Sequence, residues 1–225
     1  MDSPYRTYQE RLERFIGAVT VYPVSCEALA NGRGDAEWLD AVLAGGARIV
    51  QLRDKLASDR VLFEKALLFR QKTSQAGALF IVNNRVDIAI MSGADGVHLG
   101  NSDVPAPAAR SMAPGLIIGV SANTLDQAAS ARERGASYFN IGPLFPTETK
   151  AGLVNFLGPA AIAEFASQSD LPFTVMGGIK LQHVPALTAL GARRIAVVTA
   201  ITRAVDMAAE TRLWHETMQQ NLNRD

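Results

Sequence analysis

The apolar positions of this chain fall into short dense runs, separated by longer stretches in which apolar residues recur every three or four positions. Eight runs rich in branched and aromatic residues are typical of buried parallel strands. They span residues 18–24, 47–52, 78–83, 96–99, 116–121, 138–142, 173–176 and 194–198. The stretches between these runs have the spacing of amphipathic helices, so strands and helices are expected to alternate along the chain.

The predicted helices fill the intervals between the runs. Two of them are marked by apolar stripes, one formed by Leu62, Ala66 and Phe69 and the other by Val205, Ala208, Ala209 and Leu213. Further helices are predicted near residues 36–43, 86–91, 106–112, 125–134, 160–168 and 184–190. Residues 7–16 predict one more helix, within an N-terminal extension of residues 1–17, that covers the floor of the fold.

Strands that alternate with helices in this way predict an α/β protein built as a single (β/α)8 TIM barrel with an extra N-terminal helix. An open doubly wound sheet is the alternative that the same pattern allows. No linker, low-complexity segment or block of charge interrupts the series, so we expect one domain over residues 1–225. Active sites of such barrels lie at the carboxyl ends of the strands. The residues that follow each run are therefore the candidates for chemistry.

The composition narrows the functional classes. Of the 225 residues, 48% are hydrophobic, enough for a large core, and the formal net charge is zero. A chain without an overall positive charge lacks the field that holds nucleic acid or an anionic membrane. No apolar run approaches the length of about 18 residues that predicts a membrane-spanning helix, and the polar first residues lack the pattern of a signal peptide. Because Cys26 is the single cysteine, no internal disulfide can form, and we expect a cytoplasmic protein.

The second predicted strand ends in the sequence Gln51-Leu52-Arg53-Asp54-Lys55. Since successive strand side chains point to opposite faces, the amide, the guanidinium and the ammonium of Gln51, Arg53 and Lys55 share one side. A forked donor beside a point charge suits an anion with several oxygens, and a diphosphate fits best. The alternative is a barrel strand that ends in surface salt bridges, and this segment alone leaves both interpretations open.

Two later strand ends predict a phosphate site. Gly177 and Gly178 follow the seventh run, Val198 ends the eighth and Thr199 follows it, where backbone N–H groups of such barrels hold an anion. The alternative is that the glycines only permit a tight turn. The long loop after the sixth run ends Thr147-Glu148-Thr149-Lys150, whose hydroxyls and ammonium could close over an anion.

Asp103 and the pair Asn83 and Asn84 are the candidates for magnesium, which is usually held by one or two carboxylates together with substrate phosphates and water. Asp103 could equally cap the helix predicted to begin near Pro105. Among the histidines, His98 is expected to point into the barrel as a satisfied interior side chain rather than as a catalyst.

Taken together, these segments resemble the thiamine phosphate synthases, over about residues 18–203. The markers are Gln51-Leu52-Arg53-Asp54-Lys55, Asn83-Asn84-Arg85-Val86-Asp87, Ala94-Asp95-Gly96-Val97-His98-Leu99-Gly100, Gly119-Val120-Ser121, Gly142-Pro143-Leu144-Phe145-Pro146-Thr147-Glu148-Thr149-Lys150, Gly177-Gly178-Ile179 and Ala196-Val197-Val198-Thr199-Ala200-Ile201. Each marker is weak alone, but seven in this order at the ends of barrel strands are specific.

The resemblance implies an enzyme that joins hydroxymethylpyrimidine diphosphate to hydroxyethylthiazole phosphate and releases diphosphate. It implies catalytic roles for Arg53, Lys55, Ser121 and Lys150. The pyrimidine diphosphate would be bound by Gln51, Leu52, Arg53, Asp54, Lys55, Asn83, Ser121 and Lys150. The thiazole phosphate would be bound by Thr147, Glu148, Thr149, Gly178, Val198 and Thr199. The cofactor would be Mg²⁺, held by Asp103 with Asn84 as second ligand, and a homodimer is an expectation that the sequence leaves open.

The chain departs from the family pattern at the expected metal site. The family usually has aspartate where this chain has Asn84, and Asn101-Ser102 replaces a more usual Gln-Glu or Gln-Asp. Both changes remove negative charge and are expected to weaken metal binding. Two alternatives remain open at this point. One is a non-catalytic barrel that binds a phosphorylated metabolite. The other is the sister family of thiazole tautomerases, which uses a histidine where this chain has Asn123.

Overall fold

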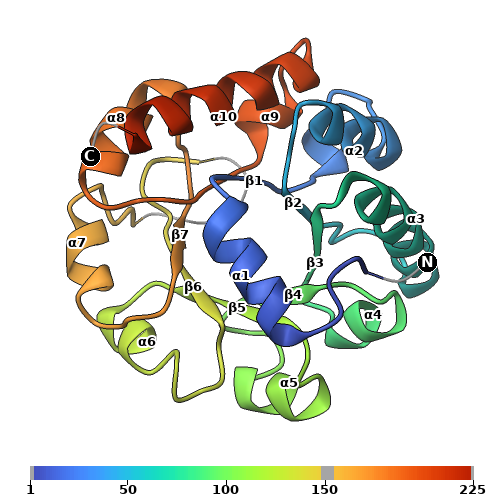
Figure 1. Ribbon diagram of the computed structural model, residues 1–225, viewed down its shortest axis with the longest axis horizontal. Coiled ribbons are helices and arrows are strands. Elements are labelled where there is room, and N and C mark those ends of the chain that lie inside the picture. The colour runs from blue at the N-terminus through green and yellow to red at the C-terminus, as the bar shows by residue number, and fades with distance from the viewer. Residues whose placement is uncertain (1–2, 148–154, 224–225) are drawn as a thin grey trace.

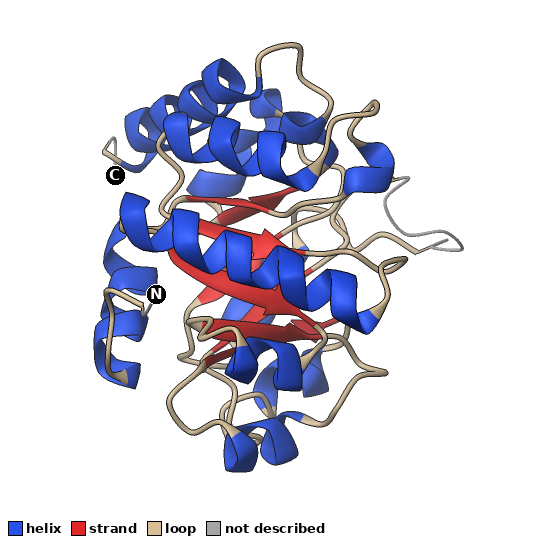
Figure 2. Cartoon of the chain, turned by 90° about the vertical axis from the view of Figure 1, so that its right-hand side faces the viewer, coloured by secondary structure: helices blue, strands red, loops and turns tan. Residues whose placement is uncertain are grey.

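The computed structural model describes residues 3–147 and 155–223. Within them, parallel strands form the wall of a barrel and helices cover its outside (Figures 1 and 2). The strands are β1 (Val21–Pro23), β2 (Ile49–Leu52), β3 (Leu79–Asn83), β4 (Gly96–Leu99), β5 (Ile117–Ala122), β6 (Tyr138–Ile141), β7 (Phe173–Val175) and β8 (Ile195–Val197). Each predicted strand is present, with ends that move by a few residues.

The helices occupy the predicted intervals. They are α1 (Tyr8–Ala18), α2 (Asp35–Ala44), α3 (Asp59–Ala76), α4 (Val86–Met91), α5 (Ala106–Met112), α6 (Leu125–Ala129), α7 (Ala161–Ala166), α8 (Val184–Ala189), α9 (Thr199–Thr202) and α10 (Met207–Leu222), with 3-10 turns η1 (Glu27–Leu29) and η2 (Leu181–His183). Among the described residues, no helix combines the length and the apolar character needed to cross a membrane.

The strand order β1-β8-β7-β6-β5-β4-β3-β2 leaves β1 and β2 at the two ends of one sheet. These ends meet just beyond β1, where Val24 forms a parallel bridge with Gln51 and the Ser25 N–H donates to the Gln51 carbonyl at 2.8 Å. The sheet therefore curls back on itself, which confirms the predicted barrel over the open doubly wound alternative.

The side chains of β2 alternate between two layers of the core. Ile49 packs inside the barrel, with side chains from β1, β3, β5 and β6. Val50 and Leu52 point the other way, into the layer between the strands and the helices. All four residues of β2 are buried, so the strand contributes side chains to both layers. As a result, the inward side chains of the strand ends are the ones that can reach a site at the mouth of the barrel.

Helix α3 follows the sequence pattern closely. The Ser58 side chain caps its first turn by accepting from the Val61 N–H, and Gly77 ends it in the left-handed conformation at φ 61°. The predicted stripe of Leu62, Ala66 and Phe69 is its buried face.

The stripe predicted for the last helix is wrong. Val205 precedes α10 and is fully exposed, and Leu213 is also exposed. The buried face is formed instead by Met207, Thr211, Trp214 and Met218. The predicted stripe depended on alanines, whose small side chains do not distinguish one face of a helix from another. The large side chains of Trp214 and Met218 remove far more surface from water and decide the orientation.

Helix α1 crosses one end of the barrel (Figure 1), as predicted for residues 7–16. It begins with a reciprocal cap, in which the Thr7 hydroxyl accepts from the Glu10 N–H and the Glu10 carboxylate accepts from the Thr7 N–H. Phe15 is fully buried against Tyr138 of β6, with ring centroids 4.5 Å apart. The Arg194 guanidinium donates to the Phe15 carbonyl at 3.0 Å. The helix thus closes the barrel interior from below.

We predict that Phe15→Ala lowers the free energy of unfolding by about 3–5 kcal/mol, because it removes a fully buried ring from a packed interior. Urea denaturation followed by circular dichroism measures this loss. Ile16→Ala is the matched control on the same helix, because Ile16 is 49% exposed, and it should cost less than about 1 kcal/mol. Equal losses for the two variants would show that α1 does not seal the barrel.

Candidate active site

A cavity of about 1350 Å³ opens at the carboxyl ends of the strands. It brings together most of the residues singled out from the sequence. Of these, its walls include Gln51, Arg53, Lys55, Asn83, Asn84, Asp103, Ser121, Thr147, Gly178, Val198 and Thr199. The cavity is therefore lined by cations on one side, by the glycine turn on another, and by neutral polar groups at its base.

The remaining predicted residues are placed elsewhere or are not described. Leu52 is 1% exposed and packs in the layer beneath the helices, because alternation turns it away from Gln51. The Asp54 carboxylate is engaged by Lys65 and by backbone N–H groups of its own loop. Neither side chain lines the cavity, and their binding of substrate stays a prediction. Glu148, Thr149 and Lys150 lie outside the described residues.

Arg53 is held by the segment that follows β1. Its backbone N–H donates to the Ser25 hydroxyl at 3.0 Å, and its guanidinium donates to the Cys26 sulfur at 3.5 Å. Ser25 is itself fully buried. Lys55, two residues further on, is exposed at the rim of the same cavity. The two cations therefore face one space, with Arg53 fixed and half-buried and Lys55 reaching in from solvent.

A chain of hydrogen bonds crosses the barrel interior below the cavity. It begins at Gln51, whose Nε2 donates to the Tyr22 hydroxyl at 2.9 Å. The Tyr22 and Tyr138 hydroxyls are 3.2 Å apart, and the Tyr138 hydroxyl is 3.1 Å from His98 Nδ1. His98 Nε2 is 3.3 Å from the Ser121 hydroxyl. The chain, which we call the interior relay, links Gln51 on β2 to Ser121 on β5 through side chains from β1, β6 and β4.

Burial keeps the interior relay uncharged. It lowers the pKa of His98 to about 4, so the imidazole is neutral near neutral pH. It also raises the pKa of Tyr138 well above its usual value, so the phenol keeps its proton. Because the Gln51 amide donates to Tyr22, the Tyr22 hydroxyl can donate to Tyr138 and the Tyr138 hydroxyl to His98 Nδ1. The neutral imidazole can then donate from Nε2 to Ser121. The Ser121 proton then remains available to a bound ligand.

The Tyr138 ring needs a glycine beside it. Gly119 on β5 is the register partner of Tyr138, and a Cβ atom at position 119 would lie 2.1 Å from the ring. Only glycine leaves room there for the ring, whose hydroxyl reaches His98. Sequence reasoning used Gly119 as a family marker without seeing this contact.

Gly177 and Gly178 accommodate the loop that follows β6. Both have positive φ, at 101° and 64°. The Gly177 carbonyl accepts from the Phe145 N–H at 3.0 Å, and a Cβ at position 178 would lie 2.3 Å from the Pro146 carbonyl oxygen. The glycines thus permit a sharp turn, and they also let the loop after β6 pack directly on the loop after β7.

Asp103 and Asn84 both line the cavity. One Asp103 carboxylate oxygen accepts from the Gly100 N–H at 2.6 Å. Helix α5 has Pro105 at its N-cap, with no side-chain cap, so the alternative that Asp103 caps this helix is wrong. Asn84 has a left-handed backbone at φ 67°, and its N–H donates to the His98 carbonyl at 2.8 Å. A carboxylate and an amide oxygen are both donors that suit Mg²⁺.

Another acidic cluster lies outside the cavity. Glu27, Asp35 and Asp54 place carboxylate oxygens within 4.8 Å of one another, a spacing that could hold a metal ion. The Lys65 ammonium is already bonded to all three, at 2.7 Å from Asp35 and from Asp54. The cluster therefore already has its cation, supplied by the chain.

Sequence reasoning missed several residues of the cavity wall. Asn123 donates to the Gly142 carbonyl at 2.6 Å and accepts from the Asn101 amide at 2.7 Å, which ties three strand-end loops together. Lys180 and Arg203 add two cations near the glycine turn and near Thr199. Tyr22 could have been predicted from the alternation of side chains along a strand. Val21 faces the outer layer, so its neighbour Tyr22 faces the barrel interior.

Comparison with known proteins assigns the chain to a family. Residues 21–201 match the sequence model of thiamine monophosphate synthase. The thiamine-phosphate synthase of Methanospirillum hungatei is 40% identical over 199 residues, 88% of this chain and 97% of the relative. That of Shouchella clausii is 36% identical over 201 residues, 89% of this chain and 96% of the relative.

A solved structure agrees with these relatives. The thiamine phosphate pyrophosphorylase from Pyrococcus furiosus superposes with a TM-score of 0.83 at 31% identity, covering 91% of this chain and 97% of that one. The match of the family model over most of the length, together with relatives of this similarity, shows that the chain belongs to the thiamine monophosphate synthase family.

Proposed function

We propose that this protein is a transferase that forms thiamine phosphate and diphosphate from hydroxymethylpyrimidine diphosphate and hydroxyethylthiazole phosphate. One observation carries the proposal: a single cavity is lined by Arg53 and Lys55 on one side and by Gly178 and Thr199 on another. Two anionic substrates can bind there at once, the diphosphate against the cations and the monophosphate against backbone N–H groups.

The chemistry follows from the charges. As the bond between the pyrimidine methylene carbon and the diphosphate oxygen breaks, its electron pair leaves with the diphosphate. The growing negative charge is stabilised by Arg53 and Lys55 and, by family resemblance, by Lys150. The thiazole nitrogen then donates its lone pair to the methylene carbon and closes the new C–N bond. The cavity would hold the two rings in line for this attack.

The interior relay suits this mechanism because it presents the pyrimidine with neutral groups. Gln51 and Ser121 lie at its two ends, where they can bind the nitrogen atoms of a heterocycle. A histidine with a pKa of about 4 is a poor base near neutral pH and adds no charge beside a cationic intermediate. The role of His98 is therefore to orient Ser121.

Magnesium fits the donors at the cavity mouth. Asp103 and Asn84 would hold it, and Mg²⁺ would neutralise part of the diphosphate charge. The Asp103 oxygen that accepts from Gly100 is fixed in place, which leaves the other oxygen for a metal. Only one of the two protein ligands is charged, so we expect a higher Mg²⁺ requirement than an aspartate pair would give.

The thiazole tautomerase alternative needs a histidine at position 123. The Asn123 amide nitrogen donates to the Gly142 carbonyl and its oxygen accepts from Asn101, and an amide has no acid–base chemistry near neutral pH. The other alternative, a non-catalytic phosphate-binding barrel, is decided by a turnover assay. We expect small-molecule substrates, no nucleic acid or membrane partner, a cytoplasmic location and a homodimer.

We predict that the purified protein, given both substrates and Mg²⁺, produces thiamine phosphate and diphosphate in equal amounts. Chromatography of the products, together with a coupled assay for diphosphate, measures this. Calorimetry with each substrate separately provides the control, because a non-catalytic barrel would bind both and convert neither. That result would overturn the proposed function while leaving the family assignment unchanged.

We predict that Asn84→Asp lowers the Mg²⁺ concentration needed for half-maximal activity by about tenfold, because unit charges about 4 Å apart attract by roughly 1–4 kcal/mol. Aspartate tolerates the left-handed backbone at position 84, so the change should leave the fold intact. Asn221→Asp on α10 adds the same charge far from the cavity and serves as the control. An unchanged Mg²⁺ dependence would mean that position 84 is not a ligand.

We predict that Tyr138→Phe raises KM for the pyrimidine diphosphate by about threefold to tenfold, since a hydrogen bond contributes about 0.5–1.5 kcal/mol. The variant breaks the interior relay at its centre and leaves Gln51 and Ser121 without their orienting partners. KM for the thiazole phosphate should stay at the wild-type value. Tyr8→Phe is the control, since the Tyr8 hydroxyl bonds Ser137 outside the cavity. Equal changes in both KM values would show that the relay only stabilises the fold.

A further inference from the structure

The Lys65 ammonium, on α3, is the meeting point of three other segments. It donates to Glu27 of η1, to Asp35 in the first turn of α2 at 2.7 Å, and to Asp54 in the loop after β2 at 2.7 Å. Its side chain is only 21% exposed, and that of Asp35 only 4%. A single positive charge thus joins the loop after β1, a helix N-terminus and the loop after β2.

Asp54 connects this centre to the cavity. One of its carboxylate oxygens accepts from the Leu56 and Ala57 N–H groups, at 2.9 and 3.0 Å, and fixes the turn of the loop. The other oxygen is held by Lys65. Asp54 stands between Arg53 and Lys55 in the chain, and both of these cations line the cavity. Any movement of Asp54 would therefore move the two cations.

The other arm of the same centre reaches Arg53 from the opposite side. Glu27 follows Cys26 directly, and the Cys26 sulfur accepts from the Arg53 guanidinium. The preceding residue, Ser25, accepts from the Arg53 N–H. Lys65 therefore anchors both segments that hold Arg53, the end of β1 and the loop after β2.

The charges of the centre depend on the ammonium. Hydrogen bonding to Lys65 lowers the pKa of Glu27. Burial alone would raise the pKa of Asp54, but its bonds to Lys65 and to the loop backbone bring it below the usual value. Without the ammonium, three carboxylates within 4.8 Å would repel one another. The loop after β2 would then lose the geometry that Asp54 imposes.

We propose that Lys65 is a positioning residue, which holds Arg53 and Lys55 in the geometry that binds a diphosphate group by clamping Asp54 and the loop after β1. The proposal rests on the proposed function in one respect only, the assignment of the diphosphate to these two cations. Lys65 does not line the cavity, and it acts through the side chains that do.

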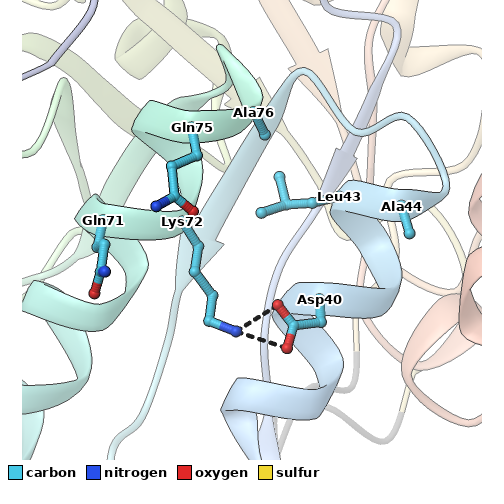
Figure 3. A pocket seen from close by; sticks show the side chains of 7 residues that line it. All are labelled: Asp40, Leu43, Ala44, Gln71, Lys72, Gln75 and Ala76. Carbon is cyan, nitrogen blue, oxygen red and sulfur yellow. Dashed lines mark hydrogen bonds and ion pairs between the residues drawn. The ribbon is translucent and has the colours of Figure 1, made fainter.

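The same helix offers a matched control. Lys72 lies seven residues after Lys65 on α3 and makes an ion pair with Asp40 of α2, at 2.6 Å, in a shallow groove between the two helices (Figure 3). Lys72 and Lys65 thus both link α3 to α2 through an aspartate. Only Lys65 also reaches the loops that carry Arg53.

The test measures binding of inorganic diphosphate and of thiazole phosphate by calorimetry, with KM for both substrates as a second readout. Lys65→Met should weaken diphosphate binding by about tenfold or more, because small displacements of positioned groups are costly. Binding of thiazole phosphate should be unchanged. Lys72→Met should leave both affinities at wild-type values, and Lys65→Arg, which keeps the charge, should retain most of the diphosphate affinity.

Equal effects of Lys65→Met and Lys72→Met, or an equal loss for both ligands, would overturn the proposal. If Lys65→Met fails to fold, diphosphate binding by Asp54→Asn tests the proposal instead. In this variant the amide oxygen can still accept from Leu56 and Ala57, while the charge facing Lys65 is lost. Wild-type diphosphate affinity in Asp54→Asn would then overturn it. A wild-type protein that binds diphosphate but makes no product would refute the proposed function and leave this inference standing.

Discussion

Closure of the barrel imposes one requirement on every strand: half of its side chains must fill a sealed interior, and any polar group among them must find a partner there. The interior relay meets this requirement. Gln51, Tyr22, Tyr138 and His98 are all buried, and each is hydrogen-bonded to the next. An unpaired hydroxyl or imidazole at this depth would destabilise the fold. The relay thus helps to stabilise the barrel, and in the proposed function it also presents neutral groups to the pyrimidine.

As a result, the polarity of the interior side chains changes along the barrel axis. At the lower end, Phe15 of α1 closes an apolar floor against Tyr138. In the middle, the relay is polar but neutral, because burial disfavours charge on His98 and on the tyrosines. At the mouth, where water can reach, the cations Arg53 and Lys55 line the cavity. In the proposed function, the neutral pyrimidine ring would point inward and its diphosphate would lie at the mouth.

Much of this arrangement could be predicted from the sequence, and the limits have physical causes. Strand periodicity placed Gln51 and Arg53 on one face because alternation is a local property of extended chain. The same rule turns Leu52 outward, whereas resemblance alone had put it in the site. Local patterns could not show that Asp54 faces Lys65, because that contact depends on how α3 packs on two loops. The error on α10 has a related cause, since alanines carry too little surface to define a face.

Asn84 is constrained by its backbone conformation, and the proposed metal site would add a second constraint. The backbone at this position is left-handed, and its N–H donates to the His98 carbonyl, so the residue must tolerate positive φ at the end of β3. Asparagine and aspartate both do so. The backbone requirement is therefore met by either residue, and the two differ in the charge of the side chain. If position 84 holds Mg²⁺ as proposed, the affinity for the metal can therefore change there without a change in the fold.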